Sequence, residues 1–235
     1  MANAHDLLMA HRAAMMGGKL TAKDYVQDGL IAMWDGIENA GWGVHDPNAT
    51  VWKDLAGNYD LDLTSNAIWV QDGIKGVNNN NCLAKFGATI NGALHIECCW
   101  KERELSFGET CLIFTSGTKS GDRYREFLAL YGPSAQYATR GYVCRTIVYR
   151  HESKNQTSSV SAEIDNRISL NGSTLPTYYG SYFTTRGNFA MIGGTDNQGF
   201  GCTTPIHNVR VYSRALSSDE IAANYAIDNA RFGLT

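Results

Sequence analysis

The chain has 235 residues, 43% of them hydrophobic, and a formal charge of −3, so it is long enough to bury a sizeable core. This slightly acidic balance argues against the basic face that a nucleic-acid-binding protein needs. No apolar run approaches the roughly 18 residues of a membrane-spanning helix. Twelve tyrosines, 5 tryptophans and 24 glycines favour strands and turns over helices.

Residues 3–16 are predicted to form a short amphipathic helix, which Gly17-Gly18 would end. Because a helix of this length is marginal alone, we expect it to dock on the body of the domain or on a partner, as an anchor in a homo-oligomer or a larger assembly. We therefore divide the chain into an anchor segment, residues 1–28, and one domain, residues 29–235.

The first residues do not resemble a secretory signal, because Asp6, His11 and Arg12 interrupt the apolar run that such a signal requires. The six cysteines show no CxxC pair. We expect buried thiols in a protein made in a reducing compartment, rather than disulfides.

From residue 29 onward, short apolar runs alternate with turns rich in glycine and asparagine. Strands are predicted over residues 30–34, 51–54, 67–71, 82–86, 92–100, 110–116, 124–131, 142–150, 160–164, 167–170, 188–192 and 206–212. About a dozen short strands with turn signals at regular intervals are typical of an all-β sandwich. In the strand 92–100, Cys98 and Trp100 share one face, and His95, Glu97 and Cys99 share the other.

A helix of about three turns is predicted near the C-terminus. Ser217 and Glu220 have the Ser-x-x-Glu spacing of a capping box, in which each side chain bonds the other residue's backbone N–H. Leu216 and Ile221 have the spacing of a hydrophobic staple. Asp219 adds negative charge at the positive end of the helix dipole.

The sequence from residue 209 to residue 225, Val-Arg-Val-Tyr-Ser-Arg-Ala-Leu-Ser-Ser-Asp-Glu-Ile-Ala-Ala-Asn-Tyr, resembles the closing motif of laminin-G-like, concanavalin-A-like domains. Three further landmarks of that family fit in order, at residues 52–58, 168–172 and 191–194. The resemblance implies an all-β, concanavalin-A-like jelly-roll sandwich of two antiparallel sheets, one curved into a groove. The stretch 34–46 is also similar to proteins of phages and prophages.

Glucanases of the laminarinase type share the fold that this resemblance implies, so an enzymatic function needs a test. Their pattern places Glu-x-Asp-x-Glu on one strand face, because a retaining glycosidase needs two nearby carboxyl groups. Here Glu163 and Asp165 fit, but Arg167, or Ile168 if the pattern has one more residue, stands at the acid/base position. An arginine does not donate its proton at working pH. The sequence therefore predicts that the chain is not an enzyme, although carboxylates on different strands could still meet.

A sugar-binding groove combines aromatic rings with a few polar groups. Trp42 and His45 lie in a glycine-rich loop and are the best exposed candidates, the alternative being that Trp42 caps the core. His95 and Glu97 share a polar strand face that would point at a ligand if it lined the concave sheet. The remaining tryptophans are predicted to lie in the core, namely Trp34, Trp52, Trp69 and Trp100.

The family resemblance also implies a structural Ca²⁺ near the edge of the sandwich. Calcium needs six to eight oxygen ligands, to which Asp35, Asp54 and Asn58 could contribute. The same residue types are equally expected in glycine-containing turns without any metal.

These observations lead to one hypothesis and two alternatives. The hypothesis is a non-catalytic, lectin-like surface protein of a phage particle that binds a glycan or a host surface and contacts other virion proteins through its N-terminal helix. Such a protein would be made in the host cytoplasm and released in the virion; otherwise it would lie on an extracellular surface. The alternatives are a structural decoration protein without sugar binding and a glycoside hydrolase with an atypical carboxylate pair.

Overall fold

The computed structural model describes residues 19–57, 59–78, 83–90, 95–101, 110–120, 123–131, 144–151, 164–170, 173–175, 189–192, 202–203, 205–214 and 216–233. The predicted helix over residues 3–16 lies outside the described residues, as do Asn58 and Glu163.

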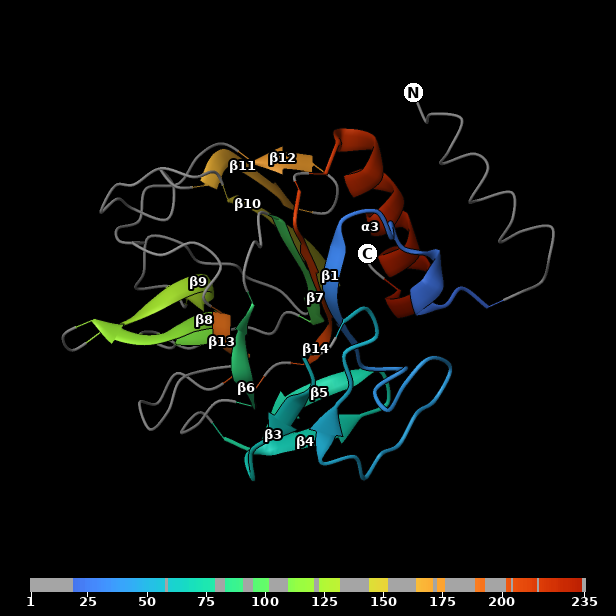
Figure 1. Cartoon of the computed structure of the whole chain (residues 1–235). Helices are drawn as coiled ribbons and strands as arrows, with labels where there is room; N and C mark the ends of the chain where they lie inside the picture. The colour runs from blue at the N-terminus through green and yellow to red at the C-terminus, as the bar shows by residue number, and fades with distance from the viewer. Residues whose placement is uncertain are drawn as a thin grey trace.

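The described residues form one 3-10 helix, a series of short strands and one α-helix. The α-helix lies at the C-terminal end of the chain and is red in Figure 1. Their bounds are η1 Ala22–Asp24, β1 Leu30–Asp35, β2 Val51–Trp52, β3 Leu61–Leu63, β4 Ala67–Val70, β5 Gly73–Gly76, β6 Ala84–Ile90, β7 His95–Lys101, β8 Thr110–Ser120, β9 Arg123–Tyr131, β10 Cys144–His151, β11 Ile164–Leu170, β12 Ser173–Leu175, β13 Phe189–Ile192, β14 Ile206–Tyr212 and α3 Ser218–Phe232. The predicted all-β class is confirmed.

The strands form two antiparallel sheets. In the first sheet the order is β12-β11-β10-β7-β14-β5-β4, and β1 pairs with β14 from off this path. In the second sheet the order is β2-β3-β6-β13-β8-β9. Because β7 and β14 are neighbours in the middle of the first sheet, polar residues from residues 95–101 and 206–212 meet on one face.

The main core lies between the two sheets. It contains Trp34, Trp100 and Val209 from the first sheet and Trp52 and Ile192 from the second, all with 0% exposure. Burial of these side chains is the main source of stability, at about 1.5–3 kcal/mol for each large apolar residue.

Helix α3 covers the other face of the first sheet and runs beside β1 and β14 (Figure 1). Every residue of β14 is therefore buried: Val209 and Val211 belong to the main core, and Asn208 and Arg210 contact Asp228 of α3. A polar strand face thus lies under a helix instead of facing solvent.

The start of α3 confirms the predicted capping box. The Ser217 hydroxyl accepts a hydrogen bond from Glu220 N at 3.3 Å, and the Glu220 carboxylate accepts one from Ser217 N at 2.8 Å. Leu216 before the cap is fully buried. The helix ends at Gly233 with φ 66°, a left-handed conformation that glycine adopts without a steric penalty, and is somewhat longer than predicted, at 15 residues.

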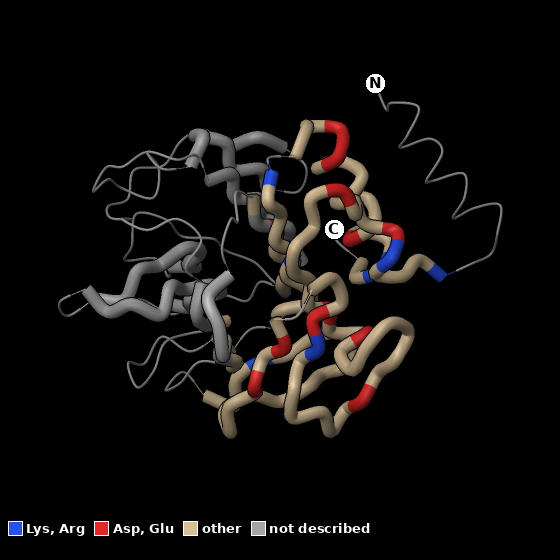
Figure 2. Tube along the Cα trace, in the orientation of Figure 1, with Lys and Arg blue, Asp and Glu red and all other residues tan. Residues whose placement is uncertain are grey.

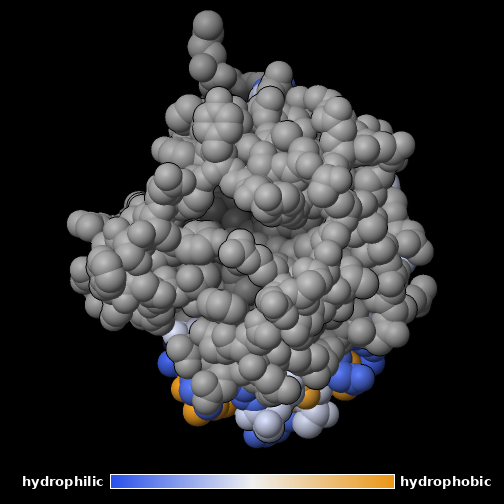
Figure 3. Space-filling view, turned by 90° about the vertical axis from the view of Figure 1, so that its left-hand side faces the viewer, coloured by the Kyte–Doolittle hydropathy of each residue, from blue (hydrophilic) through white to orange (hydrophobic). Residues whose placement is uncertain are grey.

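The end of the molecule formed by β3, β4 and β5 carries two exposed apolar side chains, Ile68 and Val77. Figure 3 shows hydrophobic (orange) and hydrophilic (blue) atoms side by side at this lower end of the view. Single apolar residues among polar ones are ordinary on a protein surface and do not mark a binding site.

Candidate functional site

A buried polar layer fills the space between α3, β1, β7, β14 and the segment that carries η1. Its members are Tyr25, Asp35, Glu38, Glu97, Asn208, Arg210, Tyr212, Asn224, Asp228 and Arg231. Charged side chains are almost never this deeply buried unless they are paired. The ion pairs and hydrogen bonds within the layer therefore determine its role.

Arg210 of β14 lies at the centre of the buried polar layer. Its guanidinium donates to both carboxylate oxygens of Asp228, at 2.7 and 2.8 Å, and to Glu97 Oε2 at 2.8 Å. The Tyr25 ring lies over the guanidinium, 4.0 Å from its Cζ. This geometry joins strand β7, strand β14 and helix α3 through one cation.

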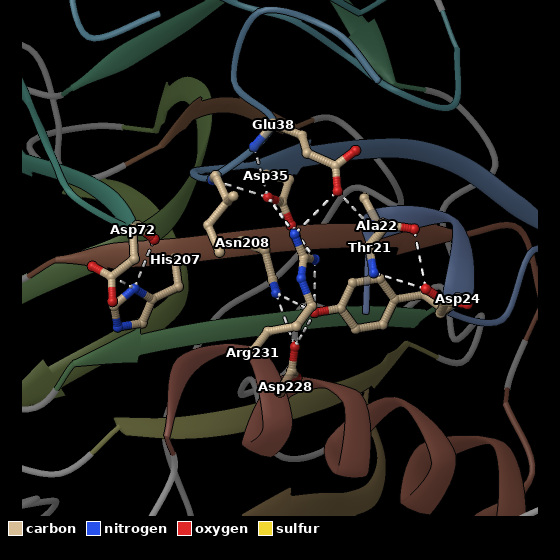
Figure 4. A network of polar contacts seen from close by, with 12 residues as sticks. Thr21, Ala22, Asp24, Asp35, Glu38, Asp72, His207, Asn208, Asp228 and Arg231 are labelled. Carbon is tan, nitrogen blue, oxygen red and sulfur yellow. Dashed lines mark hydrogen bonds and ion pairs between the residues drawn. The ribbon is translucent and has the colours of Figure 1, made fainter. Parts of the chain in front are cut away.

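Arg231 near the end of α3 makes the second ionic contact of the layer (Figure 4). It donates to both oxygens of Asp35, at 2.6 and 3.0 Å, and to Glu38 Oε1 at 3.2 Å. The last turn of α3 is therefore tied to the end of β1 and to the loop that follows it.

Burial and ion pairing act in opposite directions on the carboxyl groups of the layer. For Asp228, burial raises the pKa, but the charge and hydrogen bonds of Arg210, with bonds from Asn208 and Tyr25, bring it below the usual range. For Asp35, burial is the largest effect and holds the pKa above its usual range, although Arg231 opposes it.

Glu38 connects the buried layer to the protein surface. Its Oε1 accepts a hydrogen bond from Ala22 N at 2.6 Å, in η1, and its Oε2 accepts one from Gly43 N at 2.8 Å. Figure 4 shows this carboxylate between Ala22 and Arg231. A single carboxylate thus positions both η1 and the loop after β1.

The loop after β1 carries a tight turn over residues 41–44, which we call the Trp42 turn. Gly41 and Val44 form an isolated bridge in which Val44 N donates to Gly41 O at 2.9 Å. Gly41 and Gly43 have positive φ values of 136° and 71°, which favour glycine at both positions. The turn is fixed by local backbone geometry and by Glu38 together.

Trp42 is the most exposed described tryptophan, at 37%, and Val44 next to it is 51% exposed. A Cβ atom placed on Gly41 or Gly43 would meet nothing within 4 Å, so the backbone on either side of Trp42 in the chain borders open space. Lys23 of η1 holds its ammonium 5.4 Å from the centroid of the Trp42 ring. An exposed aromatic ring with a cation beside it is the candidate functional site.

Of the residues predicted to bind a carbohydrate, two lie at the surface and two do not. His45 is exposed, close to Trp42 in the chain, with Nδ1 3.2 Å from Ile37 O. His95 and Glu97 have 0% exposure and lie under α3, with His95 Nε2 3.7 Å from Glu97 Oε1. The prediction that His95 and Glu97 face a groove is therefore corrected, because α3 covers the polar face of β7. These two residues do not join Trp42 and His45 in one surface site.

Of the residues predicted to bind Ca²⁺, Asp35 and Asp54 already accept several hydrogen bonds, and Asn58 lies outside the described residues. The Asp35 oxygens accept hydrogen bonds from Arg231 and from Ile37 N and Glu38 N. Asp54 accepts from the backbone N–H groups of Met33, Ala56 and Tyr59. These hydrogen bonds account for the positions of both side chains without a metal, and the described residues contain no group of three or more His, Cys, Asp or Glu that could hold one; calcium binding stays a prediction.

The other tryptophans lie where they were predicted. Trp34, Trp52 and Trp100 are fully buried in the main core, and Trp69 packs against it with its ring edge to Trp52. Their burial leaves Trp42 as the tryptophan available to a ligand in the described part of the chain.

Two residues of the candidate site were not predicted. Lys23 and Glu38 lie in a segment without a strong helix or strand pattern, and their partners come from other elements. The one local signal is the spacing Thr21-x-x-Asp24, which is that of a capping box. Both reciprocal hydrogen bonds of this box are formed at the start of η1, and they fix the backbone at Lys23.

No family model and no curated protein matches the chain. Among solved structures, it is similar to a sialidase of Trypanosoma rangeli in complex with sialic acid, at 18% identity and a TM-score of 0.57 over 84% of this chain and 33% of that one. It is also similar to the HCR/D W1238A mutant, at 13% identity and a TM-score of 0.54 over 86% of this chain and 51% of that one. Domain 4 of AbnA, an arabinanase of Geobacillus stearothermophilus in complex with arabinotriose, matches at 12% identity and a TM-score of only 0.47 over 83% of this chain and 98% of that one.

The likeness to the sialidase shows a shared fold, and the chain spans about a third of the length of that sialidase. The prediction of a non-catalytic phage surface lectin is contradicted, because the similar structures include sialidases, which are glycoside hydrolases, and give no support for a virion protein. The prediction that the chain is not an enzyme is contradicted for the same reason: its fold occurs in enzymes. Among the described residues, no helix has the length and apolar character needed to cross a membrane.

Proposed function

We propose that this protein is part of a glycoside hydrolase and that the Trp42 turn holds the sugar on which that hydrolase acts. The observation that carries the proposal is an exposed tryptophan on a turn that is fixed from below by a buried carboxylate. Pyranose rings present apolar C–H faces that pack on indole rings, and a fixed turn loses little entropy when the sugar binds.

The fold supports this proposal at a general level. We infer that the two antiparallel sheets form a jelly roll of the concanavalin-A-like kind, because they share one core and pair in a non-sequential order. The sialidase with a similar fold was solved with sialic acid, a sugar ligand. Fold likeness alone does not assign a substrate, so the site must be tested directly.

A second candidate function is bond cleavage by this chain itself. Asp35 and Glu38 both accept hydrogen bonds from Arg231 Nη2, at 3.0 and 3.2 Å, and Glu38 also accepts one from Gly43 N of the Trp42 turn, so this carboxyl pair is linked to the turn. A glycosidase uses two carboxyl groups about 5–9 Å apart, one of them held protonated by its environment. The raised pKa of Asp35, caused by burial, is in the direction that an acid requires.

The test is to incubate the full chain with a panel of fluorescently labelled oligosaccharides and to follow both binding and product release. The proposed sugar contact predicts that Trp42→Ala abolishes binding, whereas the Trp69→Phe variant, altered at the core, retains it. Cleavage by Asp35 and Glu38 predicts product release that Asp35→Asn and Glu38→Gln each reduce by at least about a hundredfold.

Binding without product release supports a sugar-holding domain whose catalytic groups lie in other residues, and it rules out the Asp35–Glu38 pair. Binding that survives Trp42→Ala contradicts the Trp42 turn as the sugar contact. Absence of both binding and cleavage over the whole panel contradicts the proposal.

A further inference from the structure

The geometry of η1 and the Trp42 turn points to a preference among sugars. We infer that Trp42 and Lys23 form a subsite for a carboxylate-bearing sugar, such as a uronic acid or a sialic acid. The inference rests on the proposed sugar contact at Trp42 and adds the chemical class of the sugar.

Lys23 and Trp42 can contact one ligand together. The Lys23 ammonium lies 5.4 Å from the centroid of the Trp42 ring. Because the ammonium lies over this ring, a pyranose ring that packs on the indole takes a place beside the Lys23 side chain, with a ring substituent toward the ammonium. A carboxylate there forms an ion pair with the ammonium, whereas the hydroxymethyl group of a neutral sugar offers only an uncharged acceptor.

The two side chains are held at this spacing by a shared support. The Glu38 carboxylate accepts one hydrogen bond from the backbone N–H of Ala22 and one from that of Gly43. Ala22 precedes Lys23 in the chain, and Gly43 follows Trp42. Because Glu38 is 6% exposed and also bonds Arg231, its carboxylate is fixed to the buried layer. The subsite is therefore built on a rigid base, which lowers the entropy lost on binding.

Within the described part of the chain, no carboxylate forms an ion pair with Lys23. Asp24 accepts from Thr21 N at 2.7 Å and from the Thr21 hydroxyl at 3.0 Å, within the capping box of η1. Asp46 accepts from Asn48 N at 2.8 Å, within its own turn. The Lys23 ammonium is thus available to an anionic ligand, apart from its contact with the Trp42 ring.

The experiment compares methyl β-glucuronide with methyl β-glucoside, which differ only in a carboxylate against a hydroxymethyl group. Binding to the full chain is measured by titration calorimetry at low and high salt, for the natural protein and for Lys23→Gln, Lys23→Arg and Trp42→Ala. Sialic acid serves as a second acidic probe.

We expect the glucuronide to bind more tightly than the glucoside, and Lys23→Gln to lower the affinity for the glucuronide by about three- to fivefold, the size of an exposed charge interaction. Lys23→Arg should keep the preference, added salt should weaken it, and Trp42→Ala should abolish binding of both sugars. Lys23→Gln should lower the affinity for the glucoside less than it lowers the affinity for the glucuronide.

Equal affinities for the two glycosides, or an equal loss for both in Lys23→Gln, would overturn the acidic-sugar inference and leave the Trp42 sugar contact standing. If neither glycoside nor sialic acid bound at all, the inference and the Trp42 sugar contact would both fail.

Discussion

Arg210 and Asp228 form a two-pronged ion pair, with donor–acceptor distances of 2.7 and 2.8 Å, at a place where neither side chain has accessible surface. This pair joins the central strand of the first sheet to α3. Figure 2 shows acidic (red) and basic (blue) residues close together where α3 meets the first strand and η1. The buried layer beneath the Trp42 turn depends on such contacts.

Removing one partner of this pair should destabilise the protein strongly. Asp228→Ala leaves the Arg210 charge buried with only part of its pairing, and we expect a loss of about 3–5 kcal/mol in the free energy of unfolding. The control is Lys53→Ala, which breaks the exposed Lys53–Asp60 pair and should cost less than about 1 kcal/mol. Urea titration followed by circular dichroism measures both values; equal losses would mean that the buried pair has no special role.

Glu38→Gln tests whether this carboxylate fixes the Trp42 turn. Glutamine offers one acceptor oxygen where Glu38 offers two, so one of the Ala22 and Gly43 amides loses its partner. We expect a loss of about 1–3 kcal/mol in stability and faster hydrogen exchange at Gly43 or Ala22. The matched control on the same loop is Asp46→Asn. Unchanged exchange at both amides in Glu38→Gln would show that the turn is rigid without this support.

The two classes of tryptophan should respond differently to truncation. Trp52→Ala removes a fully buried side chain and should cost about 3–5 kcal/mol. Trp42→Ala alters an exposed residue and should change stability by less than about 1 kcal/mol. Thermal unfolding of the two variants checks this contrast, and a large loss in Trp42→Ala would indicate that Trp42 supports the fold instead of facing a ligand.

The start of α3 should be sensitive to acid. Hydrogen bonds from Arg214 lower the pKa of Glu220 to about 2, from 4.5 in an unstructured chain. Because the folded pKa is the lower one, this stabilisation is present above pH 4.5 and is lost as the pH falls from 4.5 toward 2.

Glu220→Gln should remove this part of the pH dependence and Arg214→Gln should remove the share that Arg214 contributes, so combining them should remove no more than Glu220→Gln alone. Unfolding midpoints across this pH range give the measurement. A steeper acid response in Glu220→Gln than in the natural protein would be inconsistent with a lowered pKa.

Local signals in the sequence predicted much of the fold. Ser217 and Glu220 marked the start of α3, and the alternation of residues 92–100 correctly placed Cys98 and Trp100 in the core, opposite His95, Glu97 and Cys99. The strand at residues 206–212 was predicted with its correct bounds. These features depend on neighbours in the chain, which is why sequence reasoning reaches them.

Strand β5 was not predicted, because Gly73 and Gly76 suggest a turn. The structure gives the reason for one of these glycines: a Cβ atom on Gly73 would lie 2.5 Å from Ile206 O, so the close approach of β14 requires glycine there.

The polar face of β7 was misinterpreted for a different reason. Alternation shows that His95 and Glu97 share a face, but not whether solvent, a ligand or a helix covers it. Glu97 contacts Arg210 and Asn224, which lie 113 and 127 residues away in sequence. Pairings over such distances depend on sheet order and helix docking, and no local pattern encodes them.

The central claim is that the Trp42 turn holds a sugar. Its most direct test is to follow the indole N–H signals of all five tryptophans by NMR while glucuronide or sialic acid is added to the full chain. We expect the Trp42 signal to shift and to saturate, while the signals of the fully buried Trp34, Trp52 and Trp100 stay in place. A Trp42 signal that does not move at saturating concentrations of either sugar, or that moves no more than those of the buried tryptophans, would contradict the claim.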